Sequence, residues 1–228
     1  MKISGASLKI ILDSRGKETL EAELKSEQFL ASASVPSGKS TGSHEAFVLE
    51  PKLALGKFED VKAQILSQEF QSQEEFDKFL IQLDGNPSTG SGQAKQNLGG
   101  NLILALSLAF ARLMAKTENL ELFQYVRNNF QIPTSIFQIP KPIFNMIEGG
   151  VHAKNQLNFQ EFQVIPQVNE FAMALGFGQE FYRKLGEFLA QKFGNHAKRD
   201  YSHAERVKEN VILGDEACFS CPFKNNEE

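Results

Sequence analysis

Four short segments combine glycines with side chains that can bind an anion or move a proton. They are Asp13-Ser14-Arg15-Gly16, the loop Pro36-Ser37-Gly38-Lys39-Ser40-Thr41-Gly42, Gly149-Gly150-Val151-His152-Ala153 with Gln160-Glu161-Phe162, and Gly214-Asp215-Glu216. A glycine-rich Ser/Thr loop can bind an anion through its backbone N–H groups, and a histidine can exchange a proton near neutral pH. Each segment alone also has a structural reading as a turn, a solvated histidine or a helix cap. A catalytic or binding function is therefore inferred only from the occurrence of all four segments together.

Two further motifs point to functions that the surrounding sequence argues against. Gly38-Lys39-Ser40 imitates the end of a nucleotide-binding P-loop, but that motif needs glycine at position 33, where Ala33 stands, and Gly42 interrupts the helix that should follow. Cys218 and Cys221 form a C-x-x-C pair without the second pair that a structural zinc site needs. We therefore predict neither nucleotide binding nor a zinc or redox site.

The composition is that of a mildly acidic globular protein. The 228 residues contain 24 Lys+Arg and 28 Asp+Glu, a formal net charge of −4, which disfavours nucleic acid as a partner because phosphate binding needs a basic excess. The sequence contains neither a long apolar run nor the features of a signal peptide, and two cysteines cannot build a disulfide framework. We expect a cytoplasmic protein with no membrane partner.

Residues 1–130 are predicted to form an α+β domain. Thr19 to Leu24 alternates apolar and acidic residues with the period of two that is typical of a strand with one buried face. Flanking strands are predicted at Lys9 to Leu12 and Phe29 to Val35, giving a three-stranded antiparallel sheet. From Phe58 the period becomes helical, and the widest apolar stripe predicts a central buried helix with Leu102, Leu106, Ala109 and Leu113.

Residues 131–228 are predicted to begin an α/β (TIM-type) barrel. The prolines between Gln131 and Pro142 mark the boundary. Short strands are expected at Ile143 to Ile147 and Phe159 to Pro166, then a long helix from Phe171 to Leu189 and an apolar run at Val211 to Leu213. A complete barrel takes about 250 residues, so this segment is expected to be an incomplete one.

In this order and at these separations, the four segments resemble the enolases, the phosphopyruvate hydratases of glycolysis. The resemblance also includes Leu83-Asp84-Gly85, Leu98-Gly99-Gly100-Asn101 and the end from Asn225 to Glu228. It implies a lyase that converts 2-phosphoglycerate to phosphoenolpyruvate with two Mg²⁺ ions. In that reaction a lysine base removes a proton, metal ions stabilise the enediolate, and a glutamic acid protonates the departing hydroxyl.

The resemblance assigns roles to individual residues. Glu216 falls at the position of the glutamic acid that acts as general acid. Ser40 matches the loop serine that reaches the second Mg²⁺, and His152, Gln160 and Glu161 match residues that line the substrate pocket. Glu21, with Arg15 alongside, matches a position near the homodimer interface of the family.

Several positions depart from the family pattern. The departures are Lys17-Glu18 for Asn-Pro, Lys39 for a small alanine, Glu148 and Val151 for Asn and Ser, Ala217-Cys218 for Gly-Gly, and an extra residue near Cys221. Side chains at 217 and 218 must be accommodated where the family has a backbone without them.

The resemblance also implies missing parts. The three metal carboxylates of the family, its lysine base and its second pocket lysine would all fall beyond Glu228. We therefore expect an enolase N-terminal half that is inactive alone and that could pair with a complementary C-terminal half. It would be a truncated gene product, a split subunit or an incomplete sequence. The alternative is a non-catalytic fragment or split subunit that acts through protein interaction.

Overall fold

The computed structural model describes residues 1–38, 42, 44–85, 95–130, 140–150, 153, 155–193, 213–214 and 217–227. The chain forms two compact units, Met1–Phe137 and Gln138–Glu228. The domain boundary predicted between residues 130 and 131 stays a prediction, because residues 131–139 lie outside the described part.

The first unit contains the predicted antiparallel sheet, in the order β1 (Gly5–Leu12), β2 (Glu18–Lys25) and β3 (Leu30–Ser34). Leu20, Ala22 and Leu24 of β2 are completely buried, as the period of two predicts. Their side chains form one side of the main core of this unit.

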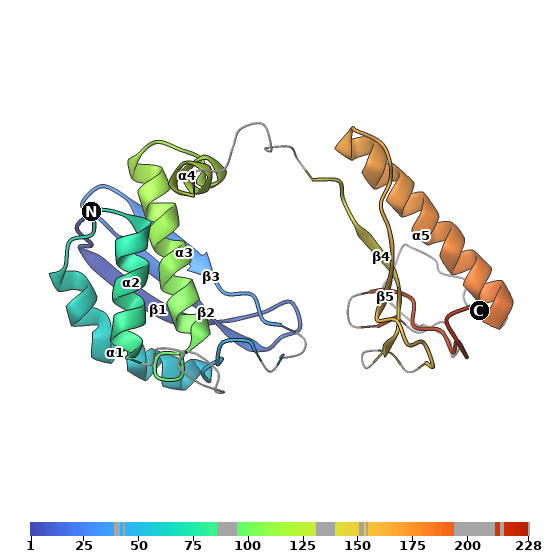
Figure 1. Ribbon diagram of the computed structural model, residues 1–228, viewed down its shortest axis with the longest axis horizontal. Coiled ribbons are helices and arrows are strands. Elements are labelled where there is room, and N and C mark those ends of the chain that lie inside the picture. The colour runs from blue at the N-terminus through green and yellow to red at the C-terminus, as the bar shows by residue number, and fades with distance from the viewer. Residues whose placement is uncertain are drawn as a thin grey trace. The chain divides into compact units, whose positions relative to one another are not determined.

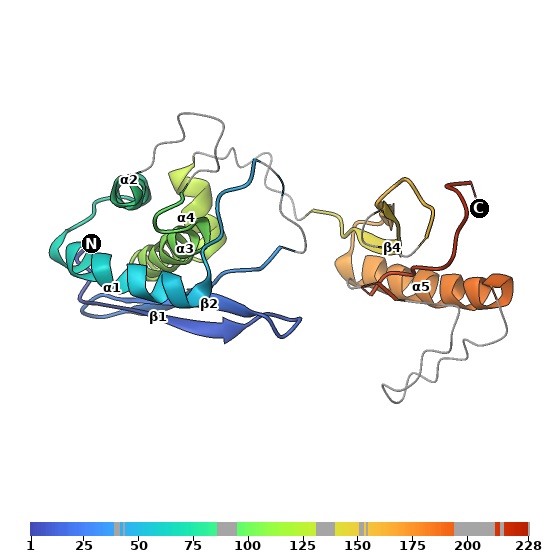
Figure 2. The same ribbon diagram turned by 90° about the horizontal axis from the view of Figure 1, so that it is seen from below.

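The described residues of the first unit also form the helices α1 (Pro51–Ser67), α2 (Gln73–Asp84), α3 (Gly100–Thr117) and α4 (Leu122–Asn129). Figures 1 and 2 show the helices on one face of the sheet, with α3 passing over it. The predicted central helix is confirmed: α3 contacts β2, β3, α2 and α4, and its stripe Leu102, Leu106, Ala109 and Leu113 is fully buried. Among the described residues, α3 is the one helix whose length and composition would suffice to cross a membrane, and 56% of that span is buried inside the protein, as in a core helix.

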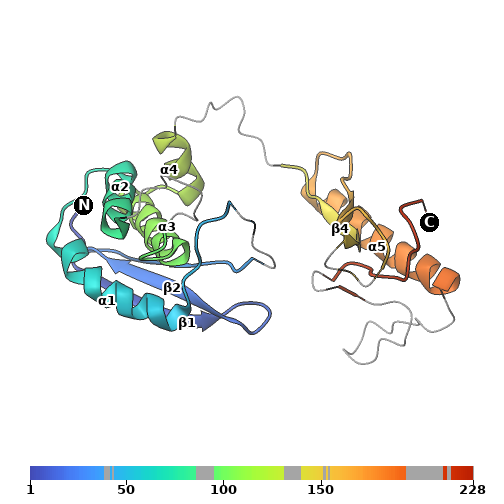
Figure 3. The ribbon, with the colours of Figure 1, turned by 60° about the horizontal axis from the view of Figure 1, so that its bottom comes forward.

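Helix α1 begins seven residues earlier than the apolar period predicts, at Pro51 instead of Phe58. Proline occupies the first helical position, and the Glu50 carboxylate accepts a hydrogen bond from the Leu53 N–H (3.0 Å). Before Phe58 this helix buries only Ala54, so its first turns carry little hydrophobic signal. Figure 3 shows α1 lying along the sheet.

Two of the motifs that carry the resemblance have structural roles here. The Asp84 carboxylate accepts hydrogen bonds from the backbone N–H groups of Asn97 (3.1 Å) and Leu98 (2.8 Å), joining the end of α2 to the entry of α3. The buried Asn101 side chain bonds both backbone groups of Leu49, at 3.0 and 2.8 Å. Both side chains satisfy buried backbone groups of the core, which is a sufficient reason for their presence.

The second unit contains β4 (Phe144–Glu148), β5 (Glu161–Val164) and α5 (Phe171–Phe193). The strands pair antiparallel, with a bulge between Asn145 and Ile147. The parallel relation expected of barrel strands occurs instead at one bridge, between Ile147 and Phe219. The described residues between β4 and β5 include no α-helix, and two strands joined by a short connection can pair antiparallel. Of the predicted run Val211 to Leu213, only Leu213 lies among the described residues.

Helix α5 packs on the strands through its smallest residues. A Cβ on Gly178 would lie 2.6 Å from the Phe144 ring, and one on Gly186 would lie 2.9 Å from the Phe219 ring. Leu189 joins Leu157, Phe219, Cys221 and Phe223 in the core of this unit. The strand ends that carry the candidate site are therefore held by direct packing against α5.

Candidate functional site

Three sequence motifs of the second unit meet at the end of β4. The Gly149 N–H donates to the Gln160 carbonyl (2.7 Å), which brings the two halves of the Gly-Gly and Gln-Glu motif together. The Glu148 N–H donates to the Phe219 carbonyl (3.0 Å), and the Phe219 N–H donates to the Met146 carbonyl (2.9 Å). These bonds place the segment after Glu216 beside the segment before His152.

Both glycines of this motif are required by the backbone. A Cβ on Gly149 would overlap the Phe159 carbonyl oxygen and lie 2.6 Å from the Leu157 Cβ. Gly150 has a φ of 62°, in the left-handed region that favours glycine. The turn is closed by the bond from the Gly150 N–H to the Leu157 carbonyl (3.0 Å). The two glycines thus allow a sharp return of the chain toward β5.

Asparagines complete this return. Asn155 donates from its side chain to the Glu148 carbonyl (2.9 Å), and the Asn226 side-chain oxygen accepts from the Asn158 N–H (2.8 Å). No role for Asn155 follows from the sequence. Asn226 belongs to the terminal motif that contributes to the resemblance. Neither residue carries a sequence signal for this contact, because each partner is fixed only when the loop is folded.

Gln160 and Glu161 lie at the start of β5. Gln160 is exposed and Glu161 is half-buried. Glu161 pairs directly across the sheet with Glu148, and its carboxylate accepts a hydrogen bond from the Gln163 amide (2.6 Å). The structure therefore places Glu148, a second acidic residue, directly across the sheet from a residue of the predicted pocket.

Glu148 is one of the departures from the family pattern, and it is 3% exposed. Its carboxylate lies against the Cα of Gly214, the residue that precedes Asp215 and Glu216. The substitution is visible in the sequence, but the position of its side chain depends on the folded chain.

The residues that flank positions 215 and 216 are fixed by backbone bonds. Gly214 donates to the Cys218 carbonyl (2.9 Å), Ala217 donates to the Gly214 carbonyl (3.0 Å), and the Tyr182 hydroxyl on α5 donates to the Ala217 carbonyl (2.7 Å). Ala217 has a φ of 60°, a backbone conformation that costs free energy for any residue with a Cβ and that glycine adopts freely. This explains in physical terms why side chains at the family's Gly-Gly pair require accommodation.

Three of the predicted site residues, Ser40, His152 and Glu216, lie outside the described residues, as do Lys39 and Val151. In the first unit the described stem of the Ser40 loop bonds Arg15, whose Nη2 donates to the carbonyls of Ser37 (2.9 Å) and Gly38 (3.1 Å).

Glu21, the predicted interface residue, is engaged within its own chain. It forms an ion pair with Lys9 (2.5 Å) and accepts a hydrogen bond from the Ser34 hydroxyl (2.7 Å). The hydrogen bond from Lys9, followed by that from Ser34, lowers the pKa of Glu21 below its ordinary value.

The described residues do not provide the ligands that a magnesium site needs. Mg²⁺ is bound through oxygen ligands, chiefly carboxylates, in near-octahedral geometry. Within the described ranges no group of three or more His, Cys, Asp or Glu side chains is placed to hold a metal ion. These residues therefore do not form the site that the resemblance implies.

Cys218 and Cys221 are both completely buried. Burial raises the pKa of the Cys221 thiol to about 11, which makes it a poor nucleophile near neutral pH. Cys221 also belongs to the core of the second unit, as a small hydrophobic side chain would.

Comparison with known proteins gives two family matches along the chain. Residues 3–126 match the family model described as the enolase N-terminal domain, and residues 136–219 match the enolase C-terminal TIM barrel domain. Together the two matches run through most of both compact units.

Curated relatives give the same result. Enolases of Thermococcus gammatolerans and Pyrococcus furiosus are 35% and 34% identical over 239 aligned residues that cover all of this chain. The enolase of Methanocaldococcus jannaschii is 33% identical over 96% of the chain. The chain spans about half the length of the curated relatives it matches, 49–50% of each.

Proposed function

The chain belongs to the enolase family, and from this premise we propose that it is the pocket-forming half of an enzyme that dehydrates 2-phosphoglycerate to phosphoenolpyruvate. The observation that carries the proposal is the meeting of Gly149-Gly150, Gln160-Glu161 and the flanks of Glu216 at one end of β4. Residues that act on one small substrate must converge in this way.

In the proposed reaction Glu216 donates a proton to the departing hydroxyl group. His152, Gln160 and Glu161 bind and orient the substrate, and Ser40 contributes to a second Mg²⁺ site. A cytoplasmic location and a homodimer with Glu21 near its interface belong to the same proposal.

The chain alone is proposed to be inactive. The proton beside a carboxylate is removed only when the doubly charged product of that step is stabilised, and in the family metal ions supply this stabilisation. The chain corresponds to half of the length of its relatives. A complementary C-terminal half would have to supply the metal carboxylates and the lysine base.

The test is an assay of phosphoenolpyruvate formation from 2-phosphoglycerate and Mg²⁺. The purified chain alone should give no product above the background of an equally purified Glu216→Gln variant. The chain should give product when mixed with the remaining half of the Pyrococcus furiosus enolase, provided that size-exclusion chromatography shows that the two associate. Association without turnover, or turnover that survives Glu216→Gln, would contradict the proposal.

A second candidate function is favoured by one observation, the exposed apolar side of α5. Met173, Phe177 and Phe188 are each more than 50% exposed, and Phe181 is 38% exposed. Phe177 and Phe181 stack on each other (6.2 Å between ring centroids). Such a stripe marks a contact surface, so a non-catalytic subunit that acts through protein interaction is the alternative.

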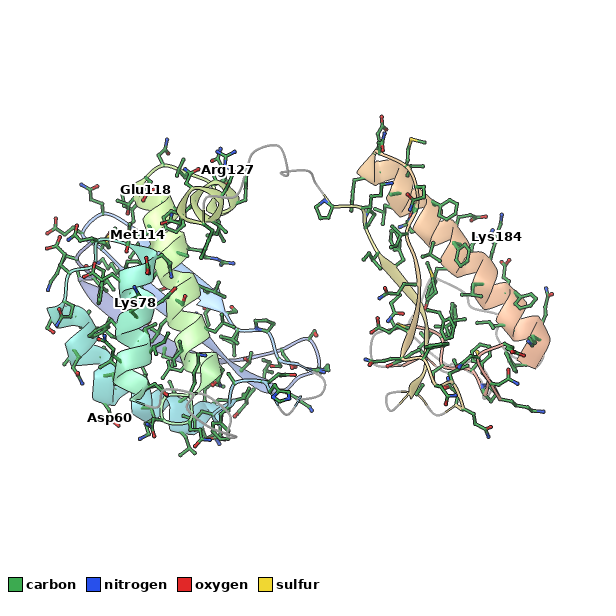
Figure 4. All side chains as sticks on the ribbon, in the orientation of Figure 1. Asp60, Lys78, Met114, Glu118, Arg127 and Lys184 are labelled. Carbon is green, nitrogen blue, oxygen red and sulfur yellow. The ribbon has the colours of Figure 1, made fainter. Side chains whose placement is uncertain are left out.

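Polar residues flank this stripe on the same helix. Arg183 bonds Glu180 and Glu187, and Lys184, which Figure 4 labels on α5, pairs with Glu180 (3.3 Å). Association in the mixing experiment that is abolished by Phe177→Ser with Phe181→Ser, but that never yields product, would favour the non-catalytic alternative.

A further inference from the structure

The turn between β1 and β2 is organised around the Asp13 carboxylate. Its Oδ1 accepts hydrogen bonds from the backbone N–H groups of Arg15 (2.8 Å) and Lys17 (2.9 Å). The hydrogen bond from Lys17 comes first among the causes that lower the pKa of Asp13 below its ordinary value, so the carboxylate is charged at neutral pH. These bonds fix the direction in which the Arg15 side chain leaves the turn.

The Arg15 guanidinium reaches a segment more than twenty residues away. Its Nη2 donates to the Ser37 carbonyl (2.9 Å) and the Gly38 carbonyl (3.1 Å), and the same nitrogen lies 3.4 Å from Asp13 Oδ2. The side chain of Arg15 is 25% exposed and that of Asp13 is 9% exposed. Hydrogen bonds from a charged donor that is partly shielded from water are stronger than neutral ones.

We propose that Arg15, oriented by Asp13, is a positioning residue that fixes the backbone of Ser37 and Gly38 and hence the point from which Lys39 and Ser40 follow. That this point matters for metal binding rests on the proposed role of Ser40. The anchor itself does not depend on that role. All three contacts are made by one nitrogen, Nη2, so the anchor depends on the positive charge and the reach of the side chain, and lysine can replace it in part.

Lys39 supplies a local probe of this anchor, because trypsin cleaves after lysine. A protease binds its substrate as an added strand through backbone groups. The carbonyls of the two residues before Lys39 are already bonded to Arg15, so cleavage after Lys39 requires their release. When opening is fast, the cleavage rate follows the population of the open form.

The experiment compares the rates of tryptic cleavage of the full chain after Lys39, followed by mass spectrometry. Arg15→Gln should accelerate this cleavage about tenfold, as expected from the loss of charge-assisted bonds. Arg15→Lys, which keeps the charge, should give a smaller increase. Asp13→Asn, which keeps an oxygen acceptor but lacks the charge, should also give a smaller increase.

The matched control is Arg112→Gln. Arg112 also donates to a backbone carbonyl, that of Ser32 on β3 (2.9 Å), but it does not bond the stem of the loop. Its substitution should leave cleavage after Lys39 unchanged.

Two results would overturn the proposal. One is an unchanged rate after Lys39 in Arg15→Gln. The other is an equal acceleration after all lysines and arginines, because that pattern reports unfolding of the chain rather than release of Ser37 and Gly38. Failure of the complemented enzyme to form phosphoenolpyruvate would contradict the proposed function and leave these cleavage rates as they are.

Discussion

The carboxylate of Glu148 occupies the space beside Gly214 in which any other residue would place its Cβ. The absence of a side chain at Gly214 thus leaves room for the Glu148 side chain between the end of β4 and the segment that leads to Asp215 and Glu216. Gly214→Ala should destabilise the second unit by about 1–3 kcal/mol, because the new methyl group overlaps a buried side chain. Native-state hydrogen exchange at the amides of Glu148 and Phe219, both of which are hydrogen-bonded, measures this loss.

The same substitution in a Glu148→Ala background supplies the control. With the carboxylate gone, the added methyl group has room, so the double variant should lose less stability than the sum of the two single variants. Additive losses would show that the contact is absent in solution.

Two glycines two positions apart on α5 should respond in opposite directions to alanine. A Cβ on Gly178 would lie 2.6–2.8 Å from ring atoms of Phe144, whereas one on Gly176 would have no neighbour within 4 Å. Gly178→Ala should cost about 1–3 kcal/mol, and Gly176→Ala should gain about 0.5–1 kcal/mol because alanine favours the helix. Hydrogen exchange of α5 measures both changes, and equal signs would rule out the packing of α5 on β4.

Ala217→Gly should stabilise the second unit. The φ of 60° costs alanine about 1–2 kcal/mol, and glycine would remove this cost. Glycine also raises the conformational entropy of the unfolded chain, which offsets part of the stabilisation. The net gain expected is about 0.5 kcal/mol in the exchange free energy of the Phe219 amide. A loss of stability would indicate that the Ala217 methyl group makes a favourable contact.

The Cys221 thiol should make the second unit sensitive to alkali. Its pKa is about 11 in the folded chain, against 9.0 for an exposed thiol. The folded state therefore retains the proton that the unfolded state loses, so stability is fully present below pH 9 and falls as the pH rises toward 11. The rate at which a thiol reagent labels Cys221 should rise between pH 9 and 11 by more than the ionisation of a free thiol predicts. The Cys221→Ala variant should lack the loss of stability of the second unit over the same pH range.

Residues beyond Pro140 are expected to exchange faster than the first unit. Helix α5 buries Ala174, Gly178 and Leu189 but leaves Phe177 and Phe188 more than half exposed, whereas the stripe of α3 is completely buried. Exchange of α5 amides in a proven monomer should be faster than that of α3 amides. Equally slow exchange in the two helices would show that the second unit is stable by itself.

Part of this fold was predictable from local periodicity. Leu20, Ala22 and Leu24 alternate with acidic residues, and the apolar positions are the ones that the sheet buries. This alternation is a local signal, so the strands of the sheet could be predicted from it. The stripe of α3 is equally local. The family could be inferred because its motifs occur together along the chain and require no knowledge of their contacts.

The tertiary structure decided the remaining relations. That β5 runs antiparallel to β4, that Arg15 bonds Ser37 and Gly38, and that the Glu148 carboxylate lies against Gly214 all depend on residues far apart in sequence. Neither the direction of a strand relative to its neighbour nor the target of a long side chain changes the period of apolar residues. Such contacts are selected only when the chain packs, because each partner is one of many that the residue types alone allow.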